Sequence, residues 1–300
     1  MALTGKQFTI RAGKHEVTAV EVGGGLRSYS HGGTQVLAGY GEDELPPSGA
    51  GGVLMPWPNR LAGGRYTFGG QAYQVPITEV PRGNAIHGLA RWSRWSPVAV
   101  NPAAVTLGLD IVPQNGWPFE VRVEVTYALH PDHGLAVTAV ARNHGKTPAP
   151  FGAGFHPYFW LHGHPLDDVT VHVPANQRLV TDEAQLPVGL QAVDKTPYDL
   201  RRPGRLGATR LDDAFTDLST VDGRGSVDVL TGSGGARLWF DETFQYLQVY
   251  THEHLGGGAP AVAVEPMTCP ANAFNSGAGL LILEPGKMWT GTWGIAPLQR

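Results

Sequence analysis

The stretch VRVEVTYAL, residues 121–129, indicates which class of fold to expect. Apolar side chains stand at every second position, and polar residues fill most of the positions between them; the apolar set is Val121, Val123, Val125, Tyr127 and Leu129. Successive side chains of a β-strand point to opposite faces of its sheet. The alternation therefore predicts a half-buried antiparallel strand.

The surrounding sequence continues this pattern. LAVTAVARN (residues 135–143) follows after the turn-like HPDHG, so the two segments are predicted to form a hairpin. Further short strands are expected in RYTFGGQAYQV, with a two-residue turn at Gly69-Gly70, and in ARLWFD, YLQVYT, AVAVE and GLLILEPG. No run of ten residues has helical apolar spacing, and strands do not alternate with helices. The predicted fold class is all-β, with large antiparallel sheets packed as a sandwich and little helix.

The composition fits this class. The chain has 300 residues, of which 41 are Gly and 24 are Pro, and these are spread along its length as expected for many turns. The polar, Pro- and Gly-rich stretch 193–211 is interpreted as a long surface loop rather than as a linker, because strand patterning resumes on both sides of it.

The charge and the termini suggest where the protein works. The formal net charge is −4 and no basic run of five residues occurs, so nucleic acid is not an expected partner. Cys269 is the only cysteine, which rules out an intrachain disulfide and fits a reducing compartment. The N-terminal sequence lacks an apolar signal core, and no apolar stretch is long enough to cross a membrane. A cytoplasmic protein without a membrane partner is expected.

Five segments place ionisable residues among Gly, Pro and aromatic residues, as loops at the mouths of β-folds often do. They are MPWPNRLAGG, GNAIHGLARW, GFHPYFWL, LDDAFTDL and VEPMTCPANAFN. In the last of these, Glu265 ends a predicted strand. Ala261 and Ala263 lie on the same face of that strand as Glu265 and are small enough to leave room for a ligand. A structural salt bridge is the alternative for this carboxylate, because burying it without a partner is costly.

His156, in GFHPYFWL, titrates near neutral pH and is a candidate proton donor; a histidine packed among aromatic residues is the alternative. Arg60 and His87 are interpreted as donors that position a ligand, with a surface ion pair and a core histidine as the respective alternatives. The doubled Asp212 and Asp213 form either a turn or acceptors for sugar hydroxyls.

Other chemistries find little support. HGH (162–164) and HEH (252–254) lack a closing set of ligands at a familiar spacing, so no metal site is predicted. Neither a phosphate-binding glycine loop nor a GxSxG nucleophile motif occurs. Cys269 is interpreted as a packing residue.

In their order along the chain, NRLAGGRYTFGGQAYQV, NAIHG, HPYFWL, DDAFTDL and VEPMTCPANAFNSG resemble the aldose 1-epimerase (mutarotase) family. The match runs from about Gly51 to Gly286. The resemblance implies a single β-supersandwich domain over residues 1–300. It implies that the protein interconverts the α and β anomers of a free aldohexose or a modified hexose and needs no cofactor. A monomer or weak homodimer is expected.

The resemblance also assigns roles to individual residues. Glu265 looks like the general base and His156 like the general acid, whereas Arg60, His87 and Asp213 look like the residues that bind and orient the sugar. Asp213 is preferred to Asp212 because it stands directly before AF. For ring opening of the hemiacetal, Glu265 is expected to be ionised and His156 protonated.

The sequence departs from the family pattern in two places. Galactose mutarotases usually carry Ser or Thr after the acid histidine and Asn after the aromatic pair, where this chain has Pro157 and Trp160. HPYF with EPMTCPANAFN is more similar to a bacterial branch in which some members act on modified hexoses.

Three other functions stay open from the sequence. A hexose-6-phosphate 1-epimerase would need a basic group for the phosphate, for which Arg82, Arg91 or Arg94 is available. A non-catalytic carbohydrate-binding protein would not need both Glu265 and His156. A glycoside hydrolase or lyase would use Glu265 and Asp213 as paired carboxyl groups.

Overall fold

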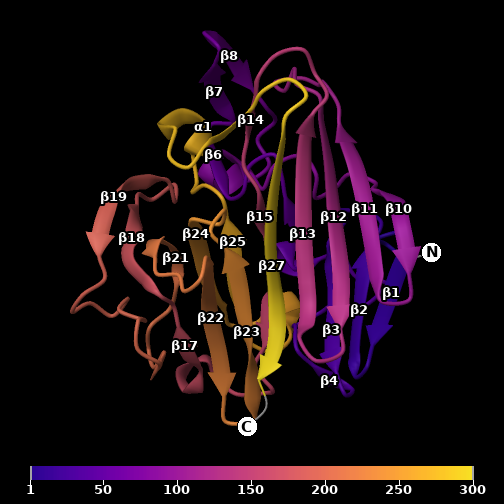
Figure 1. Ribbon diagram of the computed structural model, residues 1–300. Helices are drawn as coiled ribbons and strands as arrows, with labels where there is room; N and C mark the ends of the chain where they lie inside the picture. Colours follow the sequence, from indigo (N-terminus) through magenta and orange to yellow (C-terminus); the bar gives the residue numbers. More distant parts are fainter. Residues whose placement is uncertain (1, 299–300) are drawn as a thin grey trace.

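The computed structural model describes residues 2–298 (Figure 1). Over these residues the chain is made of β-strands and loops, with one short α-helix, α1 (Ala273–Ser276), and short 3-10 turns. All the strand ladders are antiparallel, and this confirms the all-β class predicted from the alternating pattern. The turns are η1 (Pro47–Gly49), η2 (Val80–Arg82), η3 (Leu166–Asp168) and η4 (Leu255–Gly257).

The larger of the two main sheets has nine strands and contains the predicted hairpin. Leu129 lies opposite Leu135 in it, so the two segments form the hairpin expected from the sequence. In sheet order the strands are β10 (Ser96–Asn101), β11 (Ala104–Ile111), β12 (Val121–His130), β13 (Gly134–Asn143), β27 (Met288–Leu298), β23 (Gly234–Asp241), β22 (Arg224–Thr231), β17 (Thr170–His172) and β20 (Gly204–Arg205).

The second main sheet has eight strands and carries much of the functional cleft described below. Seven of them are β19 (Pro187–Ala192), β18 (Ala175–Thr181), β21 (Asp212–Leu218), β24 (Tyr246–His252), β25 (Ala261–Met267), β15 (Gly154–Phe155) and β5 (Val53–Leu54) in that order. The eighth, β16 (Tyr158–Trp160), pairs with β25 beside β15. In Figure 1 the nine-stranded sheet crosses in front of β24 and β25.

Smaller sheets complete the molecule. The four strands β1 (Gln7–Ala12), β2 (His15–Val20), β3 (Leu26–His31) and β4 (Thr34–Gln35) form one of them. The two-stranded pairs are β14 (Ala149–Phe151) with β26 (Leu281–Leu283), β6 (Arg60–Ala62) with β9 (Asn84–Ile86), and β7 (Arg65–Phe68) with β8 (Gln71–Gln74). Gly69 and Gly70 form the predicted turn between β7 and β8, with φ of 58° and 77°. Such turns require positive φ at both residues, which glycine adopts without strain.

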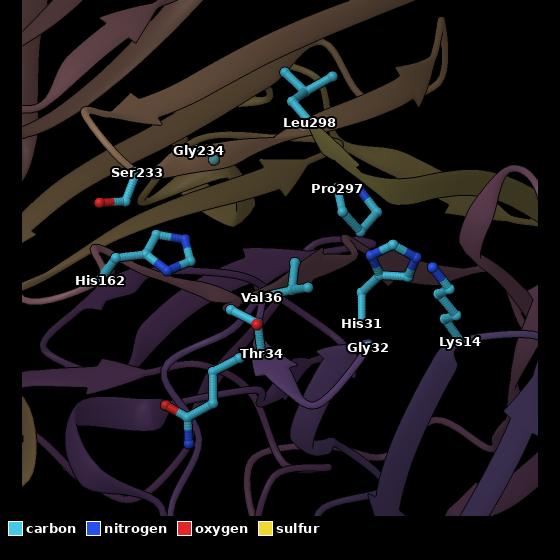
Figure 2. Close-up of a pocket in the computed structure, with 12 residues that line it drawn as sticks. Lys14, His31, Gly32, Thr34, Val36, His162, Ser233, Gly234, Pro297 and Leu298 are labelled. Atoms are coloured by element: carbon cyan, nitrogen blue, oxygen red, sulfur yellow. The ribbon is translucent and has the colours of Figure 1, made fainter. Parts of the chain in front are cut away.

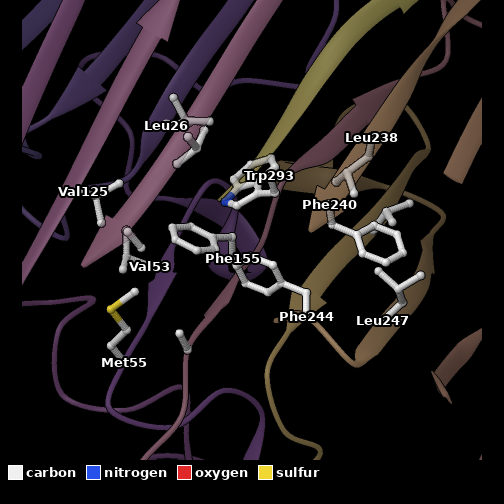
Figure 3. Packing of buried hydrophobic residues seen from close by; sticks show 14 of the residues in the cluster. Leu26, Val53, Met55, Val125, Phe155, Leu238, Phe240, Phe244, Leu247 and Trp293 are labelled. Carbon is white, nitrogen blue, oxygen red and sulfur yellow. The ribbon is translucent and has the colours of Figure 1, made fainter. Parts of the chain in front are cut away.

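The core lies between the two main sheets (Figure 3). The ring of Phe155 in β15 lies 5.1 Å from that of Trp293 in β27, so the two sheets contact each other directly. Val125 of β12 contributes the same apolar face that the sequence predicted, with no exposed surface. Each such side chain contributes about 1.5–3 kcal/mol on burial. The resulting rigid support holds the polar residues that the loops carry.

The stretch 193–211 is largely a loop, as predicted, but it is anchored to the body of the protein. Its apolar residues Val193, Leu200, Leu206 and Leu211 are buried, and its short strand β20 pairs with β17. No helix in the described part of the chain is both long and apolar enough to span a bilayer.

Candidate active site

A cleft of about 630 Å³ collects four of the five site residues predicted from the sequence. Strands β21, β24 and β25 form one wall of the cleft, and the segments around η1, β6, η2 and β9 surround it. The residues that line it and enter the argument below are Gly49, Asn59, Arg60, Glu79, Arg82, His87, Arg91, His156, Tyr158, Asp212, Gln248, Tyr250 and Glu265.

Glu265 lies on β25, directly opposite Gln248 of β24, and its side chain reaches the cleft. The residue is only 2% exposed. Burial raises the pKa of Glu265 well above its usual range; the carboxylate of Asp212 raises it further and the charge of Arg60 opposes the rise. A carboxyl group held on a central strand with a raised pKa is suited to proton transfer.

The two alanines on the same strand do not serve the ligand as expected. Ala261 and Ala263 pack in a small apolar cluster with Tyr158 and Leu255, and neither lines the cleft. Their small size leaves room for the ring of Tyr158 instead.

His156 lies in the bend between β15 and β16, and its Nε2 is 3.3 Å from Oε1 of Glu265. Backbone hydrogen bonds fix this bend, since the amide of His156 donates to the carbonyl of Gly52 and the amide of Gly51 donates to the carbonyl of His156. The imidazole stacks on the ring of Tyr158 at 4.9 Å. His156 is therefore both packed among aromatic rings and in contact with the candidate base, so its two alternatives from the sequence are not exclusive.

The protonation of this pair differs from the expectation. Burial lowers the pKa of His156 to about 3, while it raises that of Glu265. In the free cleft the neutral imidazole and the protonated carboxyl group are therefore favoured, not the ion pair. The physical reason is that both charged forms lose hydration that hydrogen bonds do not replace: Nδ1 of His156 and Oε2 of Glu265 have no hydrogen-bond partner within residues 2–298.

Arg60 begins β6 and is held by Glu79, which stands in none of the five polar segments of the sequence. Its Nε lies 2.9 Å from Oε2 of Glu79 and its Nη2 lies 3.0 Å from Oε1, a two-pronged ion pair. The Arg60 side chain is 10% exposed and that of Glu79 is 13% exposed. Arg60 therefore does form an ion pair, the alternative considered from its sequence, but the pair is almost buried at the edge of the cleft rather than on the surface.

His87 follows β9 and adopts φ of 65°, a conformation that is uncommon for residues other than glycine. Its Nδ1 accepts a hydrogen bond from the backbone amide of Asn59 at 3.2 Å, which leaves Nε2 to carry the proton. Burial, and then the neighbouring His156, keep the pKa of His87 well below its usual value. His87 is therefore a neutral hydrogen-bond donor.

Of the two aspartates, the structure brings Asp212 to the cleft and leaves Asp213 outside it. Oδ1 of Asp212 accepts a hydrogen bond from Gln248 Nε2 at 2.7 Å, beside Glu265. Because neighbouring residues of β21 point to opposite faces, Asp213 points away from the cleft and pairs with Arg178 of β18. The position of Asp213 before AF gave no information about this alternation.

Other cleft residues were also missed in the sequence. Gln248 is 4% exposed and bridges two neighbours, because its Oε1 accepts a hydrogen bond from Asn59 Nδ2 at 3.3 Å while its Nε2 binds Asp212. A polar residue in the otherwise apolar strand YLQVYT was a signal that could have identified it. Glu79 and Tyr250 had no comparable signal.

Two of the arginines weighed for a phosphate, Arg82 and Arg91, also line the cleft. Arg82 donates to Glu79 at 3.1 Å, and burial lowers the pKa of Arg91. Arg94 instead pairs with Glu21 away from the cleft.

The remaining histidines do not form a metal centre in the part of the chain that the structure describes, where no three His, Cys, Asp or Glu residues gather in a suitable arrangement. His164 bonds to Ser233 and His252 to Ser48. Cys269 is buried and makes no disulfide.

A second hollow, of about 360 Å³, lies near the end of β27 (Figure 2). Lys14 and His31 stand on one side of it, and His162 and Ser233 on the other. None of the residues that line it is acidic, so among the described residues it offers no carboxyl base.

The two main sheets form a β-supersandwich, and its cleft holds a buried carboxyl–imidazole pair of a kind that can transfer protons to and from a small polar ligand. The sequence comparison is specific: the aldose 1-epimerase family model matches residues 6–296, and the chain belongs to this family.

Individual relatives agree with this assignment. The chain is 35% identical over 287 residues to the uncharacterized protein YihR of Escherichia coli, covering 96% of this chain and 92% of that protein. It is 34% identical over 164 residues to the galactose mutarotase of Mus musculus, covering 52% of this chain and 46% of that protein. The structure of a GalM/aldose epimerase homologue from C. elegans superposes with a TM-score of 0.85 at 18% identity over 98% of this chain and 99% of that one, which shows the shared fold.

Proposed function

We propose that this aldose 1-epimerase acts on a free aldohexose or a modified hexose, with Glu265 as general base and His156 as general acid. The family interconverts the α and β anomers of aldoses, and the comparisons favour neither a hexose-6-phosphate 1-epimerase nor a non-catalytic carbohydrate-binding protein. The observation that carries the assignment of roles is the 3.3 Å approach of His156 Nε2 to Glu265 Oε1 in a sugar-sized cleft.

The pair supplies both proton transfers that the reaction needs. For ring opening, the Glu265 carboxylate takes the proton from the anomeric O1–H, while protonated His156 gives a proton to the ring oxygen O5 as the C1–O5 bond breaks. The products are the open-chain aldehyde, a protonated carboxyl group and a neutral imidazole. Each group contributes on the order of 10²–10⁴-fold to the rate when it is correctly placed.

Ring closure uses the same groups in exchanged roles. After rotation about C1–C2, O5 attacks the other face of C1, neutral His156 accepts the proton from O5–H, and Glu265 returns a proton to O1. The protonation state favoured in the free cleft is the one that performs this closing step. Ring opening begins after the proton moves from Glu265 Oε1 to His156 Nε2, so the pair keeps one proton throughout and the balance closes without another reactant.

The remaining cleft residues are proposed to bind and orient the sugar. Arg60 and His87 offer donors for hydroxyl oxygens, as the resemblance implied. Asp212, rather than Asp213, is proposed as the acceptor for a hydroxyl group, with support from its place in the cleft and its hydrogen bond to Gln248.

We further propose a single domain over residues 1–300 that works in the cytoplasm as a monomer or weak homodimer, without nucleic acid or membrane as partner. The absence of a basic run in the sequence supports the part of this proposal that excludes nucleic acid.

Polarimetry tests the proposed function. The purified protein is added to freshly dissolved α-D-galactose or α-D-glucose, and the approach to the equilibrium rotation is compared with the spontaneous rate. A rate that depends on protein concentration is expected. If the protein binds these sugars, by calorimetry, without accelerating the change in rotation of any of a panel of free and modified aldohexoses, it is a carbohydrate-binding protein instead.

A further inference from the structure

Glu79 stands at the edge of the cleft and accepts hydrogen bonds from three side chains. Arg60 donates to it through Nε and Nη2, Arg82 donates through Nη1 at 3.1 Å, and Asn84 donates through Nδ2 at 3.2 Å. The proposed proton transfers give this half-buried carboxylate no task.

The two-pronged contact fixes the orientation of Arg60. A guanidinium group carries five N–H donors in one plane, and Glu79 engages two of them along one edge. Of the other donors, Nη1 has only a contact of 3.5 Å to Asn59 Oδ1, at the limit of a hydrogen bond. The opposite edge of the guanidinium group is therefore left to meet a ligand in the cleft.

Glu79 is itself held in place, so the orientation it imposes is a fixed one. The amide of Asn84 that binds Glu79 also donates to the carbonyl of Ala184 at 3.0 Å, which ties this rim to a distant loop. The backbones of Glu79 and Asn84 exchange hydrogen bonds in both directions. Supporting residues of this kind are what keeps a binding group within a fraction of an ångström of its working position.

Glu79 also offsets a charge that acts on the catalytic pair. The titratable and charged groups around Glu265 come from several elements: Arg60 from β6, Asp212 from β21, Tyr250 from β24, and His156 and Tyr158 from the β15–β16 segment. Arg60 is the cation that lowers the pKa of Glu265, against burial and Asp212, which raise it. The negative charge of Glu79, in contact with Arg60, weakens that field at Glu265.

We propose that Glu79 is a positioning residue of this site, which holds the guanidinium group of Arg60 toward the sugar and, by offsetting its charge, keeps the shared proton on the Glu265–His156 pair. The sugar-binding half of this inference rests on the proposed function. The electrostatic half concerns the protein alone.

Two substitutions separate the two halves. Glu79→Gln keeps the length of the side chain but removes the charge, and Glu79→Asp keeps the charge but shortens the reach by one methylene. Asp228→Asn is the matched control, because Asp228 forms a similar two-pronged pair with Arg237 at 2.6 and 2.8 Å, is 15% exposed in its side chain, and lies on β22 outside the cleft.

Three measurements are made on each variant: KM and kcat by polarimetry, the pH profile of kcat/KM, and the titration of the Glu265 carboxyl carbon by NMR, assigned with Glu265→Gln. Glu79→Gln is expected to raise KM about tenfold, as one lost charge-assisted hydrogen bond does. It is also expected to lower the pKa at which Glu265 titrates and to move both limbs of the pH profile to lower pH, by on the order of half a unit. Glu79→Asp is expected to raise KM and to leave the pH profile unchanged, because it keeps the negative charge.

The inference is overturned if Glu79→Gln, with a melting temperature close to that of Asp228→Asn, keeps the wild-type KM and the wild-type Glu265 titration. If Glu79→Gln does not fold, an unchanged KM in Glu79→Asp overturns the positioning role. Should the wild-type protein fail to interconvert anomers, the proposed function falls, yet the NMR titration still decides the electrostatic role of Glu79.

Discussion

Nε2 of His156 lies 3.3 Å from Oε1 of Glu265, and both side chains are no more than 5% exposed. Two ionisable groups at this distance in a dry environment do not titrate independently. One proton shared between them leaves the pair neutral overall, whether it rests on the carboxyl group or on the imidazole. Most of the predictions below follow from this single proton.

Glu265→Gln removes the base and leaves the shape of the cleft intact. We expect the rate of change in optical rotation to fall by about 10²–10⁴-fold, because the amide cannot accept the proton of O1–H. The melting temperature and calorimetric sugar binding check that the fold and cleft persist. Near-wild-type rotation kinetics in a folded variant would remove Glu265 from the mechanism.

His156→Asn tests the acid. The asparagine can still donate a hydrogen bond to the ring oxygen but cannot exchange a proton with it at neutral pH, so kcat is expected to fall by about 100-fold or more with a smaller change in KM. Full Michaelis curves by polarimetry separate the two constants. A change confined to KM would make His156 a binding residue only.

The shared proton also predicts how stability depends on pH. Unfolded, the two groups have ordinary pKa values near 4.5 and 6.5, whereas in the folded protein that of Glu265 is raised and that of His156 is lowered to about 3. At any pH above 6.5 that is still below the raised pKa of Glu265, the folded pair holds a proton that the unfolded chain has lost, so stability falls there as pH rises, by about 1.4 kcal/mol per unit. Between pH 4.5 and 6.5 the two shifts act in opposite directions, because the raised pKa of Glu265 makes stability fall with pH and the lowered pKa of His156 makes it rise.

Glu265→Gln should remove this contribution above pH 6.5, because the amide does not titrate and His156 is neutral in both states. Urea denaturation of wild type and variant at pH 7 and pH 8 measures the difference. Parallel pH dependence in the two proteins would show that Glu265 is ionised in the native state.

Asp212 and Asp213 are expected to have separate effects. Asp212→Asn should raise KM about tenfold or more, since it removes a charged acceptor from the cleft. Asp213→Asn should leave KM and kcat unchanged. It should lower the free energy of unfolding by about 2 kcal/mol, because it weakens the nearly buried ion pair with Arg178. Polarimetric kinetics and denaturation of both variants test this expectation. A raised KM in Asp213→Asn with an unchanged KM in Asp212→Asn would assign the binding role to Asp213.

Gly49 leaves room for the acid. A Cβ atom placed on it would lie 3.3 Å from Cδ2 and 3.6 Å from Nε2 of His156, and its φ is +79°. Gly49→Ala is therefore expected to cost about 1 kcal/mol through backbone strain and, in addition, to lower kcat by displacing the imidazole. Gly69→Ala is the control, because Gly69 has φ of +58° with no atom within 4 Å of its Cβ position. Equal kinetic effects of the two substitutions would argue against a contact with His156.

The sequence by itself determined the class of fold and the likeness to a family. The alternation in residues 121–129 requires a strand with one apolar face, because a period of two fits only a pleated backbone. Glycines such as Gly69 and Gly70 could be placed in a turn from their conformational freedom alone. The motifs around Arg60, His87, His156 and Glu265 identified residues that the structure gathers in one cleft.

Only the tertiary structure decided which of two adjacent aspartates faces the cleft, since that depends on the register of β21 against β24. It also brought in Glu79, whose partner Arg60 lies 19 positions away along the chain, and it reversed the expected protonation of Glu265 and His156. Burial and charge are properties of the assembled surroundings, and no local pattern of residues encodes how much water a side chain will lose when the sheets close around it.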